Sequence, residues 1–242
     1  MELRSERFRL RPLALADTET IARMIFADPV VTGFLAHDVR TDSDALREAA
    51  RWTQIMGIDG DGGIWDDGGI GLLAISTQET PTKTIGVAGY YMARDDDGAW
   101  SGEYFYALGR DWHFKGVMSE LAPVFRQTLQ KLPDVNLIYG VYWDGVNAAS
   151  GRILEKSGLA PAGRVAVLDE YPTEKCRAIF DYDMWRTIQA QNTPDFEIIL
   201  NQSCRRAGAV VAENIVPNNT VLSALTNSAG GRLPDTAQAL FD

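Results

Sequence analysis

Residues 139–159, "YGVYWDGVNAASGRILEKSGL", contain the pattern that decides the fold. The apolar and aromatic run up to Trp143 is typical of a strand. Asn147 is a residue type that favours the N-cap of a helix, and the segment after it has helical periodicity. Gly158 can adopt the left-handed backbone that ends helices. The stretch therefore predicts a strand, a short loop and a helix.

The segment before this unit predicts another strand and helix. "EYFYALG" at residues 103–109 has the composition of a strand, and apolar residues at helical spacing follow between 118 and 132. Between them, "DWHFKGVMSE" at residues 111–120 places Gly116 at the entrance of the helix. A helix N-terminus attracts phosphates through unpaired N–H groups and the positive end of its dipole. The alternative is that Gly116 is a simple turn residue.

Pro123 falls inside this second predicted helix. A proline in a helix interior removes one hydrogen bond and clashes with the preceding turn. Two interpretations follow: the helix is kinked, or it starts late, near Ser119, so that the proline lies close to its first turn.

Further toward the N-terminus the sequence predicts one strand, two helices and a meander. "RFRLRPL" is the strand, Asp17 can cap the first helix, and Thr41 to Asp44 resembles a capping box for the second. "GLLAIST", "TIGVAGYYMA" and "WSGEYFYAL" follow as three antiparallel strands.

Toward the C-terminus, "RVAVLDE" and "RAIFDYDMW" predict a hairpin. The complete order of elements indicates an α+β, or α/β layered, domain on one mixed sheet.

Composition excludes several classes of function. The 242 residues are 45% hydrophobic and 23% charged, as in a globular protein that stays in the cytoplasm. No apolar run approaches the roughly 18 to 20 residues of a membrane span, and the N-terminus has no apolar signal core. A net charge of −10 opposes nucleic acid and weakly favours cationic acceptors. Two cysteines and two histidines match no metal pattern.

The composition changes near Thr187. Six of the eight asparagines lie in the last 56 residues, whereas every tryptophan and tyrosine lies before them. We therefore predict a domain over residues 1–186 and a C-terminal extension over residues 187–242. The extension has only eight charged residues, too few for a freely solvated linker. We expect it to pack on the core or on a second copy, which makes a homodimer the expected state.

The unit at residues 139–159 resembles a signature of the GNAT family of acyl-CoA-dependent N-acyltransferases. The similarity is to the branch of ribosomal-protein (alanine/serine) N-terminal acetyltransferases. The matching positions are Asn147, Ser150, Leu154, Glu155, Lys156 and Gly158, with Ile153 and Leu159 as conservative replacements. The opening "ERFRLRPLALAD" also resembles this branch, so the resemblance covers roughly residues 5–186.

The loop at residues 113–119 departs from the family pattern. Gly116 is kept, but Phe114 stands where glycine is usual and Met118 where alanine or glycine is usual. These departures, together with Pro123, favour an alternative to catalysis. In that alternative the chain is a catalytically silent GNAT-fold protein with a binding or assembly role.

The resemblance implies a mixed, mostly antiparallel sheet flanked by helices, and acetyl transfer from acetyl-CoA without a metal. A primary amine, on a protein N-terminus or a small cationic molecule, would attack the thioester directly in a cleft between two splayed strands. The pantetheine arm is assigned to the backbone of Tyr106, Ala107 and Leu108. The remaining cofactor residues that it implies are His113, Phe114, Lys115, Gly116, Val117, Met118, Ser119, Asn147 and Lys156.

Catalysis needs a neutral amine and a proton for the leaving thiolate. Many family members use a tyrosine for that proton, but this position is Leu154, so the resemblance assigns the task to Ser150. Asn147 would position the cofactor or the acceptor, although asparagine and serine also suit ordinary helix capping. Glu103 and Glu170 are candidates for the general base. The alternatives are a solvent-facing glutamate and a water chain.

Overall fold

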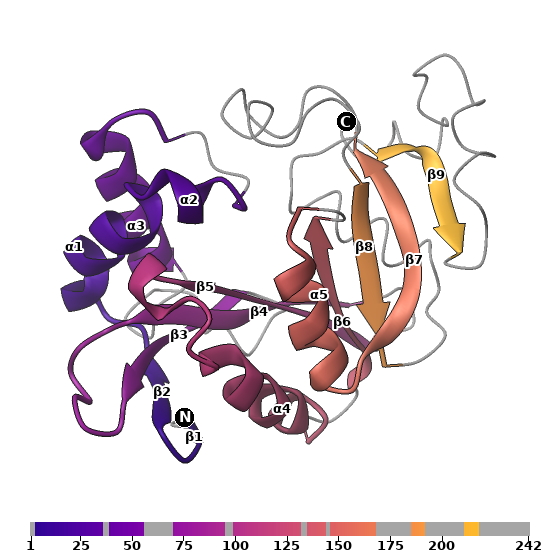
Figure 1. Cartoon of the computed structure of the whole chain (residues 1–242), viewed down its shortest axis with the longest axis horizontal. Coiled ribbons are helices and arrows are strands. Elements are labelled where there is room, and N and C mark those ends of the chain that lie inside the picture. Colours follow the sequence, from indigo (N-terminus) through magenta and orange to yellow (C-terminus); the bar gives the residue numbers. More distant parts are fainter. Residues whose placement is uncertain are drawn as a thin grey trace. The chain divides into compact units, whose positions relative to one another are not determined.

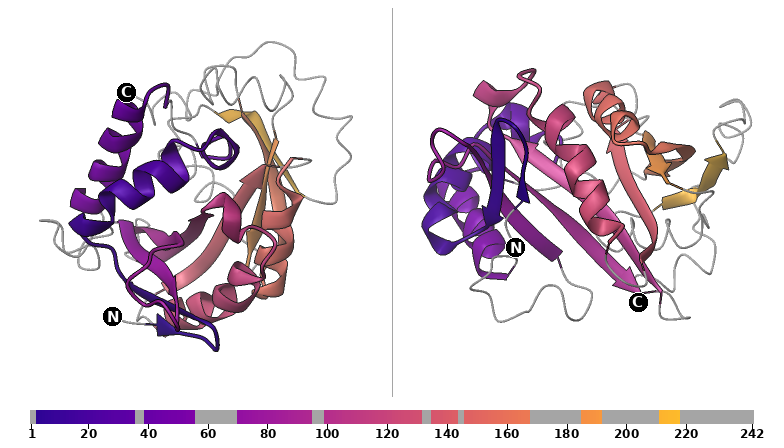
Figure 2. Two further views of the ribbon diagram at one scale, coloured as in Figure 1. Left: turned by 60° about the vertical axis from the view of Figure 1, so that its left-hand side comes forward. Right: turned by 90° about the horizontal axis from the view of Figure 1, so that it is seen from below.

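The structure is a computed structural model that describes residues 3–35, 39–55, 70–94, 99–131, 135–143, 146–167, 185–191 and 211–217. The chain forms two compact units, residues Met1–Ile138 and Tyr139–Asp242, and each is described by itself. Figures 1 and 2 show the elements of each unit, coloured along the sequence from indigo at the N-terminus to yellow at the C-terminus.

The first unit contains a meander of antiparallel strands and two groups of helices. Its elements are β1 (Leu3–Arg4), β2 (Phe8–Pro12), η1 (Leu15–Asp17), α1 (Thr18–Ile21), η2 (Ala22–Phe26), α2 (Pro29–Thr32), α3 (Asp42–Ile55), β3 (Ile70–Thr77), β4 (Gly86–Arg94), β5 (Trp100–Leu108), η3 (Arg110–Trp112) and α4 (Val117–Leu129). The strands lie in the order β1-β2-β3-β4-β5, each antiparallel to the next. The predicted meander is confirmed.

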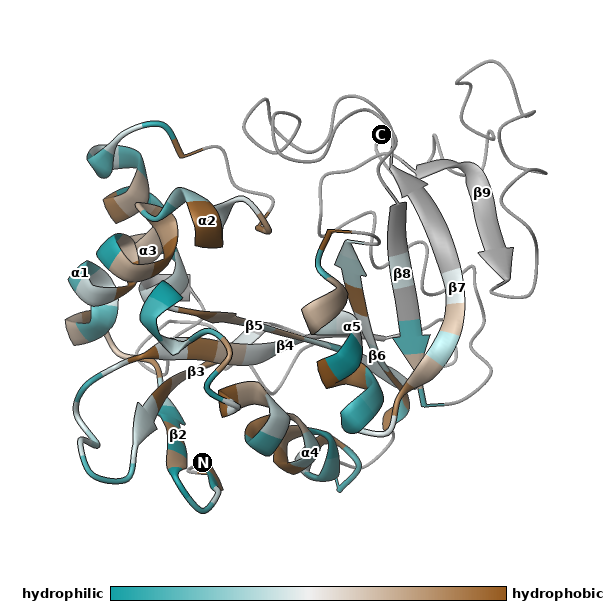
Figure 3. Cartoon of the chain, viewed as in Figure 1, coloured by the Kyte–Doolittle hydropathy of each residue, from teal (hydrophilic) through white to brown (hydrophobic). Residues whose placement is uncertain are grey.

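Aromatic packing joins the helices of the first unit to its sheet. Trp52 of α3 contacts Phe26 and Phe105 edge to face, with ring centroids 4.7 and 5.7 Å away. Val87 of β4 belongs to the same buried cluster. Tyr90 lies three residues further along β4, so it faces the opposite side of the sheet, where its ring is 4.9 Å from Phe125 of α4. Figure 3 shows apolar positions along α2, α3 and the strands of this unit.

The first predicted helix contains a π-helical turn that its sequence does not reveal. The amide of Ala27 donates to the carbonyl of Ala22, five residues back, at 2.8 Å. The wider turn rotates the following side chains, so that Ile25 and Phe26 are both fully buried. Met24, one residue earlier, is only partly buried.

The starts of α3 and α4 differ in how well the sequence predicts them. Thr41 Oγ1 accepts the amide of Asp44 at 3.1 Å, and Asp44 Oδ2 accepts the amide of Thr41 at 3.0 Å. This reciprocal pair confirms the predicted capping box. Helix α4 begins at Val117 and includes Pro123, so the interpretation that it starts late, near Ser119, is wrong.

The second unit also has antiparallel strands. Strand β6 (Val135–Trp143) enters it and is followed by α5 (Ala148–Lys156), β7 (Ala160–Val167), β8 (Trp185–Ala190) and β9 (Val211–Pro217). The pairs β6·β8, β7·β8 and β7·β9 are all antiparallel. The strand, loop and helix predicted from residues 139–159 are confirmed.

Two sequence predictions can be compared with only part of the second unit, because some of their residues lie outside the described ranges. The predicted hairpin strand at residues 177–185 lies outside the described residues except for Trp185, and the strand that pairs with β7 continues to Ala190. The predicted domain boundary at residue 186 therefore falls within β8, and the division into 1–186 and 187–242 stays a prediction. Residues 211–217 of the predicted extension pair with β7.

Candidate functional site

The loop before α4 presents a row of unpaired backbone donors. Among the described residues, the amide N–H groups of residues 114–119 donate no hydrogen bond to backbone or side chain. The first amide of this region that does so belongs to Glu120, which donates to the carbonyl of Gly116 at 3.1 Å. Because α4 is 13 residues long, its dipole adds partial positive charge at the same place. Such an end binds anions, phosphates above all.

Gly116 makes this loop geometry possible. It is the N-cap of α4 and has a left-handed backbone, with φ at 78°. Phe114 is the one described non-glycine residue with positive φ, at 59°. A bulky residue held in this region stores about 1 kcal/mol or more of strain. The family pattern that the loop resembles has glycine at this position, and glycine would adopt the same backbone without strain. The strain therefore comes from the phenylalanine of this chain.

The two bulky side chains of the loop lie away from its amides. The Phe114 side chain is 94% exposed, so little of it rests on the loop. Met118 is 3% exposed and packs in the interior of the first unit. The amides are therefore not covered by either side chain.

Two side chains of the loop, those of His113 and Lys115, have partners in the residues just before it. His113 donates from Nε2 to the carbonyl of Leu108 at 3.0 Å and so joins the loop to the end of β5. The ammonium of Lys115 lies 5.0 Å from the centre of the Trp112 ring. Lys115 is exposed, so its charge remains available at the loop.

The three residues predicted to hold the pantetheine arm lie at the C-terminal end of strand β5, just before the loop. Tyr106, Ala107 and Leu108 pair with Ala88, Val87 and Gly86 of β4. On the same strand Glu103 is only 6% exposed. The solvent-facing interpretation of Glu103 is therefore not what the structure shows. Glu170 lies outside the described residues, and the identity of the base stays a prediction.

Asn147 and Ser150 are brought together at the start of α5, in the second unit. Asn147 is the N-cap, and its Oδ1 accepts the amide of Ser150 at 3.3 Å. Capping thus accounts for the Asn147 side chain, and a role toward cofactor or acceptor stays a prediction. Lys156 lies in the last turn and is exposed.

Close packing fixes α5 against β6. A Cβ atom on Gly151 would lie 2.5 Å from Cζ of Tyr142, and one on Gly140 would lie 2.4 Å from Cδ2 of Leu154. The side chain of Leu154, which stands at the tyrosine position of many relatives, fills that space and is 1% exposed. It has no polar group to serve catalysis.

The C-terminal end of α5 is closed as its sequence predicts. Gly158, with φ at 89°, donates to the carbonyl of Glu155, and Leu159 donates to that of Leu154. This pair of bonds is a Schellman motif.

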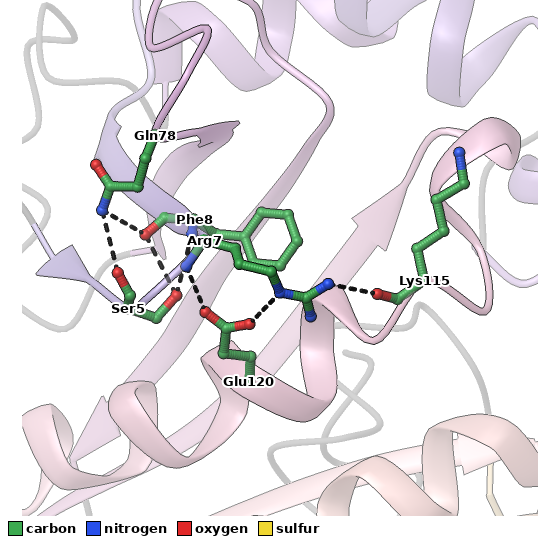
Figure 4. Close-up of polar contacts among 6 residues, drawn as sticks. All are labelled: Ser5, Arg7, Phe8, Gln78, Lys115 and Glu120. Atoms are coloured by element: carbon green, nitrogen blue, oxygen red, sulfur yellow. Dashed lines mark hydrogen bonds and ion pairs between the residues drawn. The ribbon is translucent and has the colours of Figure 1, made fainter.

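Sequence reasoning missed Arg7 and Glu120, which meet beside the loop (Figure 4). Arg7 donates from its amide to Glu120 Oε1 and from Nε to Oε2, both at 2.8 Å. Its Nη1 donates to the carbonyl of Lys115 at 3.3 Å. No local pattern connects positions 113 residues apart, so no signal in the single sequence could have found the pair.

The ion pair affects the acidity of Glu120. Burial acts to raise the pKa of its carboxyl group, but hydrogen bonds from the Arg7 amide, the Ser5 hydroxyl and the Arg7 guanidinium outweigh burial. The pKa of Glu120 therefore lies below its ordinary value. The carboxylate is charged at neutral pH.

The described residues contain neither a metal site nor a membrane-spanning helix. No group of three or more histidine, cysteine, aspartate or glutamate side chains there could hold a metal ion. No helix in the same ranges is long and apolar enough to cross a membrane.

Comparisons with known proteins bear on the family and the fold of the chain. The family model described as "Acetyltransferase (GNAT) domain" matches residues 7–160. No curated protein has a sequence that matches the chain significantly.

Several solved structures share the fold at low sequence identity. The ribosomal-protein-S5-alanine acetyltransferase of Vibrio fischeri is 15% identical, with a TM-score of 0.58, over 81% of this chain and 98% of that one. The Salmonella typhimurium enzyme that modifies the N-terminal serine of L7/L12 is 12% identical, with a TM-score of 0.58, over 78% and 98%. The microcin C7 self-immunity acetyltransferase, in complex with acetyl-CoA and AMP, is 15% identical, with a TM-score of 0.57, over 76% and 92%.

The fold is that of an α/β acetyltransferase. The family match spans more than half of the chain, and the chain therefore belongs to the GNAT acetyltransferase family. The family, the mostly antiparallel sheet flanked by helices and the enzyme class predicted from the sequence are confirmed.

Proposed function

We propose that the chain is an acetyl-CoA-dependent N-acetyltransferase that acts on a primary amine. Acetyl-CoA supplies an activated acetyl group as a thioester. The loop at residues 113–119 binds its diphosphate, and the backbone of Tyr106 to Leu108 holds the pantetheine arm. The same acetyl donor is bound by the microcin C7 self-immunity acetyltransferase, and the Salmonella typhimurium enzyme with this fold modifies the N-terminal serine of L7/L12.

One observation carries the proposal: the unpaired amides of residues 114–119. Unpaired donors in water are ordinary, but a run of them at one helix end, beside an exposed lysine, fits a multiply charged oxyanion. The departures from the family pattern at positions 114 and 118 do not oppose this binding, since Phe114 is exposed and Met118 is buried elsewhere.

The chain's own residues then have to manage charge and protons. The acceptor nitrogen attacks the thioester carbon as a neutral amine, so a bond from nitrogen to carbon forms as the bond from carbon to sulfur breaks. A protein α-amino group has a pKa of about 8, an aliphatic primary amine of about 10 and a thiol of about 8.5. At neutral pH the amine therefore must lose a proton and the thiolate must gain one. Ser150 supplies the proton to the thiolate, and Glu103 or a bound water takes the proton of the amine.

The acceptor is a protein N-terminus or a small cationic amine. The net charge of −10 favours a cation over an acidic acceptor. We propose that the protein acts in the cytoplasm as a homodimer and does not bind nucleic acid.

The first experiment is calorimetric titration with acetyl-CoA, followed by thiol release in the presence of a panel of amines and N-terminal peptides. We expect binding of acetyl-CoA and amine-dependent release of CoA. A folded protein that shows no heat at millimolar acetyl-CoA contradicts the proposal. Binding without thiol release for any acceptor instead favours the alternative of a silent GNAT-fold protein.

The role of Ser150 needs a variant with a matched control. Ser150→Ala is expected to lower kcat about a hundredfold with little change in the affinity for acetyl-CoA, as for loss of a general acid. Thr128→Ala on α4 is the control, because it also removes a helical hydroxyl, which bonds to the carbonyl of Val124 at 2.9 Å. Equal activities of the two variants would remove Ser150 from the reaction.

A further inference from the structure

The turn that carries Arg7 is held firmly beside the loop. Gln78 donates from Nε2 to the carbonyls of Ser5 and Phe8, at 3.1 and 3.2 Å, and so fixes both ends of the turn. The ring of Phe8 lies under the Arg7 guanidinium, 4.8 Å from its central carbon. Figure 4 shows this turn on one side and Lys115 on the other, with Arg7 reaching across. Arg7 is thus presented to the loop by the β1–β2 turn.

Glu120 would oppose an anion if it were alone. It lies in the first turn of α4, the same turn whose amides face the proposed diphosphate. A carboxylate there offsets the positive end of the helix dipole. Arg7 neutralises this charge through one ion pair, from Nε to Oε2 at 2.8 Å, and its backbone amide donates a hydrogen bond to Oε1 at 2.8 Å. The pair leaves Lys115 as the uncompensated charge of the loop.

The Arg7 guanidinium also has a donor to spare. Nε bonds to Glu120 and Nη1 to Lys115, whereas Nη2 has no hydrogen bond within the described residues. Nη2 lies on the open side of Gly116, 3.2 Å from the place that a Cβ atom would occupy there. The Arg7 side chain is 54% exposed. A guanidinium nitrogen therefore lies beside the space that Gly116 leaves free.

We infer that Arg7 is a positioning residue of the phosphate loop: its ion pair with Glu120 neutralises the carboxylate in the first turn of α4 and holds Lys115 and Gly116 for the diphosphate. The inference rests on the proposed function. It adds a specific requirement. Binding of the phosphate groups of acetyl-CoA depends on the Arg7–Glu120 pair, whereas binding of its pantetheine and acetyl groups does not.

Calorimetry with two donors tests this requirement. Acetyl-CoA carries the phosphates, and acetyl-pantetheine lacks them. Arg7→Gln is expected to weaken the binding of acetyl-CoA about tenfold, because the Glu120 carboxylate beside the diphosphate is then no longer neutralised. The affinity for acetyl-pantetheine should stay within about twofold of the wild-type value. The double variant Arg7→Gln/Glu120→Gln, in which neither charge remains, is expected to recover most of the loss. Arg7→Lys should lie between the wild type and Arg7→Gln.

The matched control is Arg47→Gln. Arg47 pairs with Asp44 in the first turn of α3 at 2.7 Å, so this variant breaks a similar helix-start pair far from the loop in sequence. It should leave both affinities unchanged. Urea unfolding of each variant checks its fold. If Arg7→Gln is unfolded, the affinities of Arg7→Lys for the two donors provide the test instead.

The outcomes separate the inference from the proposed function. Unchanged acetyl-CoA affinity in Arg7→Gln overturns the inference while acetyl-CoA binding by the wild type stands. Equal losses for both donors also overturn it, since they show a purely structural effect. A folded wild type that binds no acetyl-CoA removes the proposed function, and the inference falls with it.

Discussion

Asp17 and Arg11 form a two-point ion pair in the interior of the first unit, with Nη1 2.8 Å from Oδ2 and Nη2 2.7 Å from Oδ1. Thr84 donates its hydroxyl to Oδ1 at 2.5 Å, and the amide of Ala14 donates to Oδ2 at 3.0 Å. The carboxylate therefore ties η1, β2 and the segment before β4 together. Its side chain is 6% exposed.

Asp17→Asn is expected to lower the free energy of unfolding by about 2 to 4 kcal/mol. The neutral amide cannot pair with Arg11, and its NH2 group faces donors instead of accepting from them. Urea unfolding measures the loss. Asp42→Asn, at the exposed start of α3, is the control and should change stability by less than about 1 kcal/mol. A loss of similar size in both variants would contradict the role of the buried pair.

The difference between wild type and Asp17→Asn should shrink in acid. Burial acts to raise the pKa of Asp17, but bonds from Arg11, Thr84 and Ala14 outweigh it and lower the pKa. The pKa of this aspartate is about 3.9 in the unfolded chain and lower in the folded protein. The charged carboxylate therefore adds stability at pH values above about 3.9, and this stability is lost as the pH falls through the pKa of the folded state. Unfolding at pH 6 and at pH 3 or below measures this. A constant difference would show that the carboxylate charge is not the cause.

Phe114→Gly is expected to raise the free energy of unfolding by about 0.5 to 1 kcal/mol. Glycine adopts the left-handed conformation without strain, and little packing is lost because the phenylalanine is 94% exposed. Affinity for acetyl-CoA should stay within about twofold, since the loop binds through backbone amides. Chemical unfolding and calorimetry check both points, with Phe114→Ala as the control that removes the ring but keeps the strain. A large loss of affinity in both variants would show that the ring itself contacts the ligand.

Gly151→Ala should destabilise the second unit by about 1 to 3 kcal/mol. Alanine is the better helix former, so propensity alone predicts a gain. The added methyl group, however, would meet the ring of Tyr142 at 2.5 Å, and overpacking dominates. Thermal unfolding measures the effect, and Gly151→Ala with Tyr142→Leu, which removes the obstructing ring atoms, should recover part of it. A stabilised single variant would mean that Tyr142 moves aside freely.

Local patterns explain why much of the fold could be predicted. The capping box at Thr41 and the glycine end at Gly158 depend on contacts within a few residues, which the sequence states directly. The strands of the meander are adjacent along the chain. The π-helical turn at Ala22 could not be predicted, because the i, i+3, i+4 pattern of apolar residues does not distinguish it from an ordinary α-helical turn.

The candidate site was predictable where a residue acts through its own backbone. The sequence predicts Gly116 and the N-terminus of α4, because a glycine just before an apolar helical pattern is a local signal for the start of a helix. The Arg7–Glu120 pair was not, since it joins a turn to a helix 113 residues later. The orientations of Phe114 and Met118 depend on the left-handed backbone at position 114 and on the interior beneath α4. Neither is visible in a residue pattern.

The open row of amides ahead of α4 has a practical consequence for handling the protein. Water must solvate these donors whenever no ligand is present, and inorganic sulfate or phosphate can take the place of that water. Buffers rich in either anion will act as competitive inhibitors and will conceal part of the affinity for the donor. Purification and assay in a weakly binding, monovalent buffer are therefore the conditions under which the loop can be judged.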